Sequence, residues 1–273
     1  MNPYKGLKTY QEEDSKYFWG RANELSSLFE QVNSRKNTIL SGMSGSGKSS
    51  LINAGLIPKL KDNGYIPIRV TPNEAIANSL MDIWKYLSNK MSQTIEDYSI
   101  KIIPHNGVTI SYKDCGLLDK LNLFDYKDEF EFNVSFVFII DQFEEIFQRK
   151  YNLKDIADFL SIYQGFCIGN FTLPLSQIRN CDLTCSFDLA SHISDNSHKF
   201  LISVRQDYLF EIDRYSVRYP LFQQNRFHLA VLNEEQAYEI ITSAKDNNGK
   251  AWFSESDATL ILQNILQTKD FVL

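Results

Sequence analysis

Apolar residues recur along the chain with two spacings, one typical of amphipathic helices and the other of buried strands. Helical spacing is clear where Leu25, Leu28, Phe29 and Val32 share one face. The segments with this spacing are 23–33, 76–91 and 154–164. Apolar runs predict strands at 38–40, 134–140 and 200–204, and the run 134–140 is apolar on both faces, as a buried parallel strand should be. Helices that alternate with such strands predict an α/β fold with a doubly wound, mostly parallel sheet.

Two further strands complete a predicted five-stranded sheet. Residues 65–70 predict an edge strand, because Pro67 cannot donate a hydrogen bond to a neighbouring strand. Residues 227–232 predict the last strand. The polar segments 92–132 and 165–198 do not follow either spacing, so we interpret them as insertions or long loops.

Two helices are expected to close the chain. The first begins after Asn233, where Gln236 completes a capping box, and ends near Gly249. The second begins after Ser254. We therefore expect a sheet domain over residues 1–232 and the start of a helical lid domain over 233–273.

The loop after the strand at 38–40 has the sequence of a phosphate-binding loop. It reads G-x-x-x-x-G-K-S, and a helix-compatible run follows, which Pro58 is expected to end or kink. Its glycines let backbone N–H groups surround phosphates, and the helix N-terminus adds partial positive charge. Lys48 would reach the β- and γ-phosphates, and the Ser49 hydroxyl would hold Mg²⁺. The predicted nucleotide-binding residues here are Gly42, Met43, Ser44, Gly45, Ser46, Gly47, Lys48, Ser49 and Ser50.

Acidic residues follow the strongly apolar strand at 134–140, which is the pattern of a Walker B strand. The sheet would place Asp141 beside the phosphate-binding loop, where it can hold Mg²⁺ directly or through water. Glu144 and Glu145 begin the next turn, and either can polarise the attacking water as a general base. The pattern does not choose between these two glutamates.

Arg205 follows the strand at 200–204. If that strand lies between the phosphate-binding strand and the Walker B strand, Arg205 is close to the γ-phosphate. It could then sense that group or stabilise charge in the transition state. The alternative is a surface arginine that pairs with Asp207.

Composition limits the partners and the setting. The chain has 273 residues, 43% of them hydrophobic, and a net charge of −6, which argues against a dedicated nucleic-acid surface. It contains no apolar run of membrane-spanning length and no N-terminal signal peptide. With scattered cysteines interpreted as free thiols, we expect a cytoplasmic protein that binds neither membrane nor nucleic acid.

With these motifs in place, the chain resembles the STAND signal-transduction NTPases, and among them the novel STAND type 1 group. The resemblance rests on ordered segments across nearly the whole chain, namely 2–7, 17–24, 41–51, 54–58, 140–147, 204–208 and 227–237. It departs at Gln206, where the family usually has a small residue. The resemblance implies a P-loop NTPase fold of the ASCE and AAA+ type.

The resemblance also implies a function. Gly20 and Arg21 look like the family's Gly-Arg element, which packs near adenine and ribose. ATP or ADP with Mg²⁺ would be the cofactors, hydrolysis would be slow, and the chain would self-associate on activation. The family adds a winged helix and sensor repeats after the helical domain. We therefore expect the NTPase module of a larger bacterial defence or signalling protein, triggered through a C-terminal region.

Other functions fit parts of the sequence. An oligomeric remodelling ATPase would need an arginine finger from a neighbouring subunit. A non-catalytic interaction module could keep a bound nucleotide for stability alone. A GTPase is disfavoured, because neither 141–144 nor 268–271 matches the D-x-x-G or N-K-x-D motif.

Overall fold

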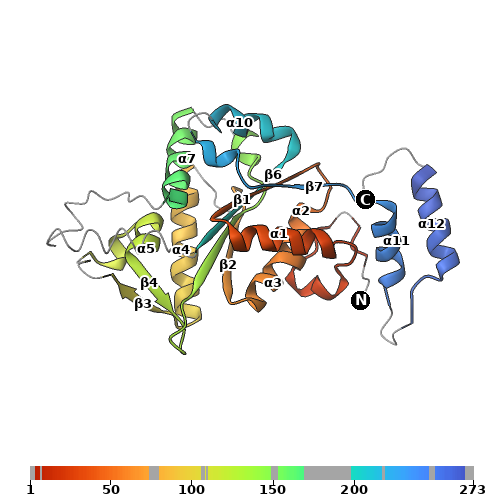
Figure 1. Cartoon of the computed structure of the whole chain (residues 1–273), viewed down its shortest axis with the longest axis horizontal. Helices are drawn as coiled ribbons and strands as arrows, with labels where there is room; N and C mark the ends of the chain where they lie inside the picture. Colours follow the sequence, from red (N-terminus) through yellow and green to blue (C-terminus); the bar gives the residue numbers. More distant parts are fainter. Residues whose placement is uncertain are drawn as a thin grey trace.

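A parallel five-stranded sheet with the order β2-β5-β6-β1-β7 forms the centre of the chain (Figure 1). Its strands are β1 (Asn37–Gly42), β2 (Tyr65–Val70), β5 (Ser135–Ile140), β6 (Lys199–Arg205) and β7 (Arg226–Leu229). The computed structural model describes residues 4–6, 8–73, 80–105, 108, 110–148, 153–168, 198–216, 219–245 and 250–267. The predicted parallel sheet is confirmed, and so is the edge position of β2.

Successive strand residues point to opposite faces of the sheet, and each face has its own hydrophobic core. Phe136, Phe138 and Ile140 of β5 belong to one core cluster. Val137 and Ile139, the residues between them, belong to the other. Because both faces are apolar, helices cover both, as a doubly wound sheet requires.

The helices on the side of the second core come from the N-terminal part of the chain. They are η1 (Glu12–Tyr17), α1 (Ala22–Ser34), α2 (Lys48–Ser50), η2 (Leu51–Leu56) and α3 (Ile57–Asp62). Among them, α1, η2 and α3 contribute residues to this core. Helical structure continues through Pro58 to Asp62, so of the two expectations, an end or a kink, the end is wrong. The backbone instead changes from π-helical to α-helical at Ile57, and Pro58 is tolerated in the first turn of α3.

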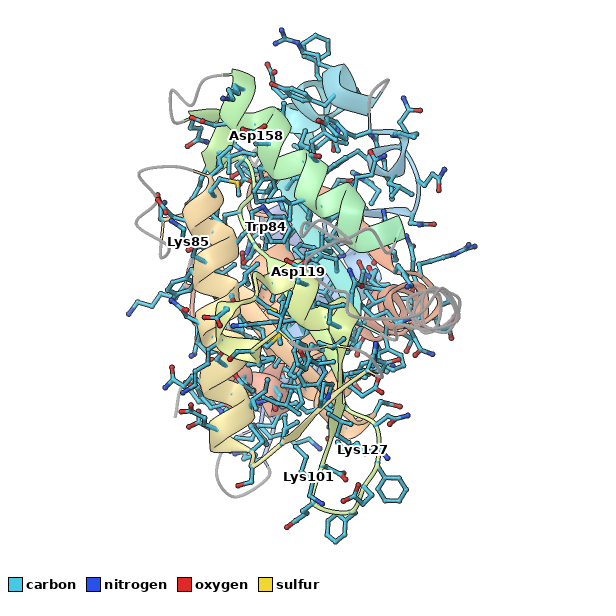
Figure 2. All side chains as sticks on the ribbon, turned by 90° about the vertical axis from the view of Figure 1, so that its left-hand side faces the viewer. Trp84, Lys85, Lys101, Asp119, Lys127 and Asp158 are labelled. Atoms are coloured by element: carbon cyan, nitrogen blue, oxygen red, sulfur yellow. The ribbon has the colours of Figure 1, made fainter. Side chains whose placement is uncertain are left out.

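The described residues of the segment 92–132 contain helices and strands, so of the two alternatives, insertion or long loop, the long loop is wrong. Along the chain, the elements of this segment follow β2 and precede β5. They are the end of α4 (Met81–Asp97), β3 (Lys101–Pro104), η3 (Tyr112–Asp114), α5 (Leu117–Leu123) and β4 (Phe124–Lys127). β3 and β4 pair antiparallel, and Lys101 and Lys127 face each other at the end of this hairpin (Figure 2). Residues 76–79 of the predicted helix 76–91 lie outside the described residues.

Helices α4 and α7 (Leu153–Ile168) cover the first core together. The ring of Trp84 stacks on Phe159, with ring centroids 4.9 Å apart, where these two helices meet (Figure 2). Shorter elements complete this side, namely α6 (Glu145–Gln148), η4 (Gln206–Tyr208), α10 (Leu209–Ser216) and η5 (Pro220–Phe222). Of the predicted loop 165–198, residues 165–168 are helical and 169–197 lie outside the described residues.

Two helices, α11 (Glu234–Ser243) and α12 (Glu255–Gln267), pack together at the opposite end of the molecule from the β3–β4 hairpin (Figure 1). The predicted capping box is confirmed, since Gln236 N donates to Asn233 Oδ1 at 2.8 Å. α11 ends at Ser243, earlier than the predicted end near Gly249. Within the described ranges, none of the helices has the length and apolarity needed to cross a membrane.

Candidate nucleotide site

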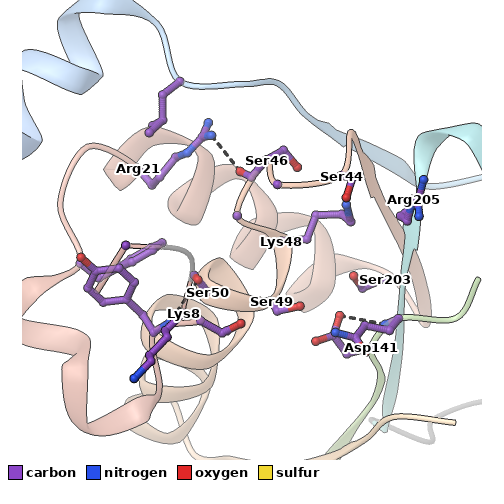
Figure 3. Close-up of a pocket in the computed structure, with 18 of the residues that line it drawn as sticks. Lys8, Arg21, Ser44, Ser46, Lys48, Ser49, Ser50, Asp141, Ser203 and Arg205 are labelled. Atoms are coloured by element: carbon purple, nitrogen blue, oxygen red, sulfur yellow. Dashed lines mark hydrogen bonds between the residues drawn. The ribbon is translucent and has the colours of Figure 1, made fainter. Parts of the chain in front are cut away.

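Three strands of the sheet end at the same edge and bring the predicted motifs together. β6 lies between β1 and β5, with Gly42 opposite Arg205 in the register of β1 and β6. The strand that ends in Arg205 therefore lies between the phosphate-binding strand and the Walker B strand, as a position of Arg205 near the γ-phosphate requires. A cavity of about 350 Å³ opens at this edge (Figure 3). Many of the site residues predicted from sequence line this cavity, namely Arg21, Ser44, Gly45, Ser46, Gly47, Lys48, Ser49, Ser50, Asp141, Glu144 and Arg205.

The phosphate-binding loop needs its glycines at particular positions. A Cβ on Gly42 would lie 2.6 Å from the carbonyl oxygen of Leu229 and 2.8 Å from Ser46 Oγ. Gly47 has φ of +89°, in the left-handed region that favours glycine. Gly42 and Met43 do not line the cavity directly, but their carbonyl groups face Lys48.

The ammonium group of Lys48 is held by the loop itself. Its Nζ donates to the carbonyl oxygens of Gly42 at 2.9 Å and of Met43 at 2.8 Å. Burial lowers the pKa of Lys48, while the carboxylates of Glu144 and Asp141 oppose that shift. A phosphate that entered the cavity would offer Lys48 an anionic acceptor in place of these neutral carbonyls.

Asp141 is fully buried at the end of β5. Its Oδ1 accepts a hydrogen bond from Gln142 N at 3.0 Å, and its Oδ2 accepts one from the guanidinium of Arg69 at 2.9 Å. Asp141 and Ser49 line the same cavity, so the structure brings the two predicted metal ligands together.

The two candidate bases occupy different surroundings. Glu144 is buried and lines the cavity, and its Oε2 accepts a hydrogen bond from Arg205 N at 3.0 Å. Burial raises the pKa of Glu144, against the lowering effects of backbone hydrogen bonds and of Lys48. Glu145 does not line the cavity and instead accepts hydrogen bonds from the backbone and side-chain amides of Asn73. The geometry thus favours Glu144.

Arg205 lines the cavity and also pairs with Asp207, as the alternative interpretation expected. Its Nε lies 3.1 Å from Asp207 Oδ1, and a terminal nitrogen lies 2.6 Å from Oδ2. The guanidinium also lies over the ring of Tyr208, 5.5 Å from its centroid. Both partners of the ion pair are partly exposed, so the pair is only weakly stabilising.

The Gly-Arg element joins the phosphate-binding loop to the C-terminal helices. Arg21 is buried and donates to the carbonyl oxygens of Ser46 at 3.1 Å and Ala230 at 2.9 Å. Gly20 does not line the cavity. It packs against α11, where an added Cβ would lie 2.7 Å from Ile240 Cγ1 and 2.9 Å from the carbonyl oxygen of Gln236.

The N-terminal segment forms a wall of the cavity that sequence reasoning missed in part. Its lining residues are Gly6, Lys8, Thr9, Tyr10, Tyr17, Phe18 and Trp19. Tyr10 N donates to Ser50 Oγ at 3.2 Å, which ties this segment to the helix after the phosphate-binding loop (Figure 3). Apart from the family resemblance, these residues match no motif, so spacing alone could not place the segment here.

Ser203 is a second cavity residue that the sequence did not indicate. It lies on β6, two residues before Arg205, and it is fully buried. Its Oγ has no hydrogen-bond partner among the described residues, although the side chain lines the cavity (Figure 3). The one indication in the sequence was that a polar residue interrupts the apolar run of β6.

Comparisons with known proteins bear on the family and the fold of the chain. The profile of the Novel STAND NTPase 1 family matches residues 3–271. Among solved structures, a Walker-type ATPase of Pyrococcus abyssi superposes with a TM-score of 0.56 at 13% identity, covering 94% of this chain and 66% of that one. The ORC2 protein of Aeropyrum pernix, in its ADPNP and ADP complexes, gives 0.47 at 13% identity, covering 82% and 51%. No curated protein matches the chain.

This chain therefore spans less than two thirds of either solved structure, 66% of the first and 51% of the second. At these identities the likeness to the Pyrococcus abyssi ATPase shows a shared fold. The family match, by contrast, covers nearly the whole chain.

Proposed function

Because the chain belongs to the novel STAND NTPase 1 family and has a P-loop NTPase fold, we propose that it binds and slowly hydrolyses ATP with Mg²⁺. The observation that carries this proposal is that Lys48, Ser49, Asp141, Glu144 and Arg205 line one cavity. These residues follow the ends of three neighbouring strands and supply the cationic groups, the metal ligands and the carboxylate base that phosphoryl transfer to water uses together with Mg²⁺. ATP and ADP are the nucleotides we expect there.

The phosphates would lie on the loop from Ser44 to Ser50, with Lys48 turned from its own loop carbonyls toward the β- and γ-phosphates. Arg205 would contact the γ-phosphate after it leaves Asp207. The base and ribose would lie against the aromatic wall of the N-terminal segment, near Arg21. This arrangement uses each lining group for the part of the nucleotide that it complements.

Ser49 and Asp141 fit a magnesium ion. Both present hard oxygen donors in the same cavity, which Mg²⁺ prefers. Within the described ranges, no cluster of three or more His, Cys, Asp or Glu side chains could hold a metal alone. A metal that takes its remaining ligands from phosphates and water needs no such cluster. Bound Mg²⁺ would neutralise phosphate charge during transfer.

Glu144 is the proposed general base. Its carboxylate lines the cavity. Its raised pKa is closer to neutral pH than that of an ordinary glutamate, and a general base is most efficient when its pKa is near the working pH. Water would give its proton to Glu144 as it attacks the γ-phosphorus, and ADP would leave. Glu145, held by Asn73, would position the turn instead.

The nucleotide would also act on the helices after the sheet. Ile240 of α11 lines the cavity, and Gly20 packs against the same helix. Occupancy of the cavity could therefore change the position of α11, which we propose is the start of a helical lid. In a larger cytoplasmic signalling or defence protein, a trigger acting through a C-terminal region would shift the chain toward a self-associated state.

The nucleotide content of freshly purified protein tests this proposal. Retained ADP or ATP, with slow phosphate release, would support a switch. An empty chain with rapid turnover that rises with protein concentration would favour a remodelling ATPase instead. Retained nucleotide with no phosphate release at all would favour a non-catalytic module.

A further inference from the structure

Arg69 makes an ion pair with the proposed metal-binding acid. It lies on the edge strand β2, next to β5, and its guanidinium donates to Asp141 Oδ2 at 2.9 Å. The Asp141 side chain is 1% exposed and that of Arg69 is 23% exposed. Strand pairing fixes this contact, because Val70 is opposite Ile140 and Asp141 N donates to the carbonyl oxygen of Val70 at 2.9 Å.

A buried carboxylate needs compensation for its charge. Asp141 receives it from a backbone N–H on one oxygen and from Arg69 on the other. Lys48 faces the same cavity, but its hydrogen bonds go to the carbonyl groups of Gly42 and Met43. The guanidinium of Arg69 is therefore the cation that forms an ion pair with Asp141 among the described residues.

We propose that Arg69 is a positioning residue that acts as a counter-ion for Asp141 and competes with Mg²⁺ for its carboxylate. This inference rests on the proposed function, in which Asp141 binds the metal. Arg69 pairs with the buried carboxylate and orients it while the metal is away. When Mg²⁺ binds at Asp141, with or without nucleotide, two cations share one carboxylate, and their mutual repulsion weakens metal binding.

The variant Arg69→Gln separates these effects. The measurement is the Mg²⁺ concentration that gives half-maximal binding of a fluorescent ADP analogue. Removing the competing charge should lower that concentration by about tenfold. Arg69→Lys keeps a cation and should stay close to wild type. Arg214→Gln is the matched control, because this exposed arginine on α10 pairs with Glu211 and does not line the cavity.

A second readout needs no nucleotide. Without metal, Arg69→Gln should melt at a lower temperature than wild type, because Asp141 loses its counter-ion. Adding MgCl₂ alone should raise the melting temperature of Arg69→Gln more than that of wild type. This arm decides the inference even if no variant binds the ADP analogue, an outcome that would contradict only the proposed function.

Several results would overturn the inference. One is a half-saturating Mg²⁺ concentration for Arg69→Gln that equals or exceeds that of Arg214→Gln. Another is an equal response of Arg69→Gln and wild type to MgCl₂ alone. If Arg69→Gln does not fold, the double variant with Asp141→Asn should fold, because both charges are then absent. Failure of the double variant would show that Arg69 acts elsewhere.

Discussion

The carboxylate of Glu144 accepts a hydrogen bond from the backbone N–H of Arg205, with Oε2 and N 3.0 Å apart. Glu144 follows β5 and Arg205 ends β6, so this bond joins two neighbouring strand ends at the cavity. It orients one oxygen of the proposed base without neutralising its charge. If a γ-phosphate displaced the backbone of Arg205, the carboxylate of Glu144 would therefore shift with it.

Replacing each glutamate separately tests which one is the base. Glu144→Gln should keep ATP binding and lower the rate of hydrolysis by roughly 100-fold or more, since a general base typically contributes that much. Glu145→Gln, whose side chain pairs with Asn73, should hydrolyse ATP at nearly the wild-type rate. Phosphate release in a single turnover measures both, and a Glu145→Gln variant as slow as Glu144→Gln would contradict the assignment.

The raised pKa of Glu144 predicts how hydrolysis depends on pH. The base works only when ionised, so the rate should fall as the pH drops through a pKa above the ordinary value of 4.5. The effect on stability has the opposite direction. Folding favours protonated Glu144, so its stabilising contribution is complete at low pH and is lost as the pH rises through the folded-state pKa.

Rate profiles against pH for wild type and for Glu145→Gln should show the same acidic limb. A profile whose acidic limb lies at or below 4.5 in both proteins would show that burial does not perturb the base.

Ser203 offers a test of function without a cost in stability. Its buried hydroxyl lacks a partner among the described residues, so Ser203→Ala should leave the free energy of unfolding nearly unchanged. If the hydroxyl contacts the phosphate or the attacking water, hydrolysis should fall by roughly 100-fold. Denaturant unfolding and phosphate release, measured on the same preparation, check both parts. Normal hydrolysis would exclude Ser203 from the reaction.

Gly20 tests the contact between the Gly-Arg element and α11. Its φ is +75°, and an added Cβ would meet Ile240 and the Gln236 carbonyl. Gly64 has a similar φ of +79°, but nothing lies within 4 Å of its Cβ position. Both alanine variants should lose about 1 kcal/mol or more from the left-handed backbone. Gly20→Ala should lose more, by the cost of displacing α11.

Unfolding in denaturant gives the two free energies, and their difference isolates the contact. Equal losses for Gly20→Ala and Gly64→Ala would mean that α11 yields to the added methyl group without cost.

Most of the sheet could be predicted from sequence, because buried parallel strands leave uninterrupted apolar runs. β5, with Phe136 to Ile140, is such a run, and its position next to a phosphate-binding loop predicts the acid that follows. The sequence left the order of the strands open, including whether β6 lies between β1 and β5. The pairing of β6 with both β1 and β5 supplied what the sequence could not, since local patterns do not specify neighbours.

The helices and strands between α4 and β5 were not predicted, because these elements are short. β3 and β4 have four residues each, and α5 has seven, too few for a period to stand out. Arg69 and Ser203 were missed for another reason. Each lies inside an apolar strand, and its importance comes from the neighbouring strand rather than from its own sequence context.

The most direct test of the central claim is a calorimetric titration of Lys48→Ala with ADP and with a non-hydrolysable ATP analogue in the presence of Mg²⁺. The matched control is Lys85→Ala, which removes a lysine from the exposed side of α4 (Figure 2). The control should bind like wild type. Lys48→Ala should lose measurable binding, a drop of roughly 100-fold or more, because charge-assisted contacts to phosphate disappear. Unchanged affinity in a folded Lys48→Ala variant would contradict a nucleotide site at this loop.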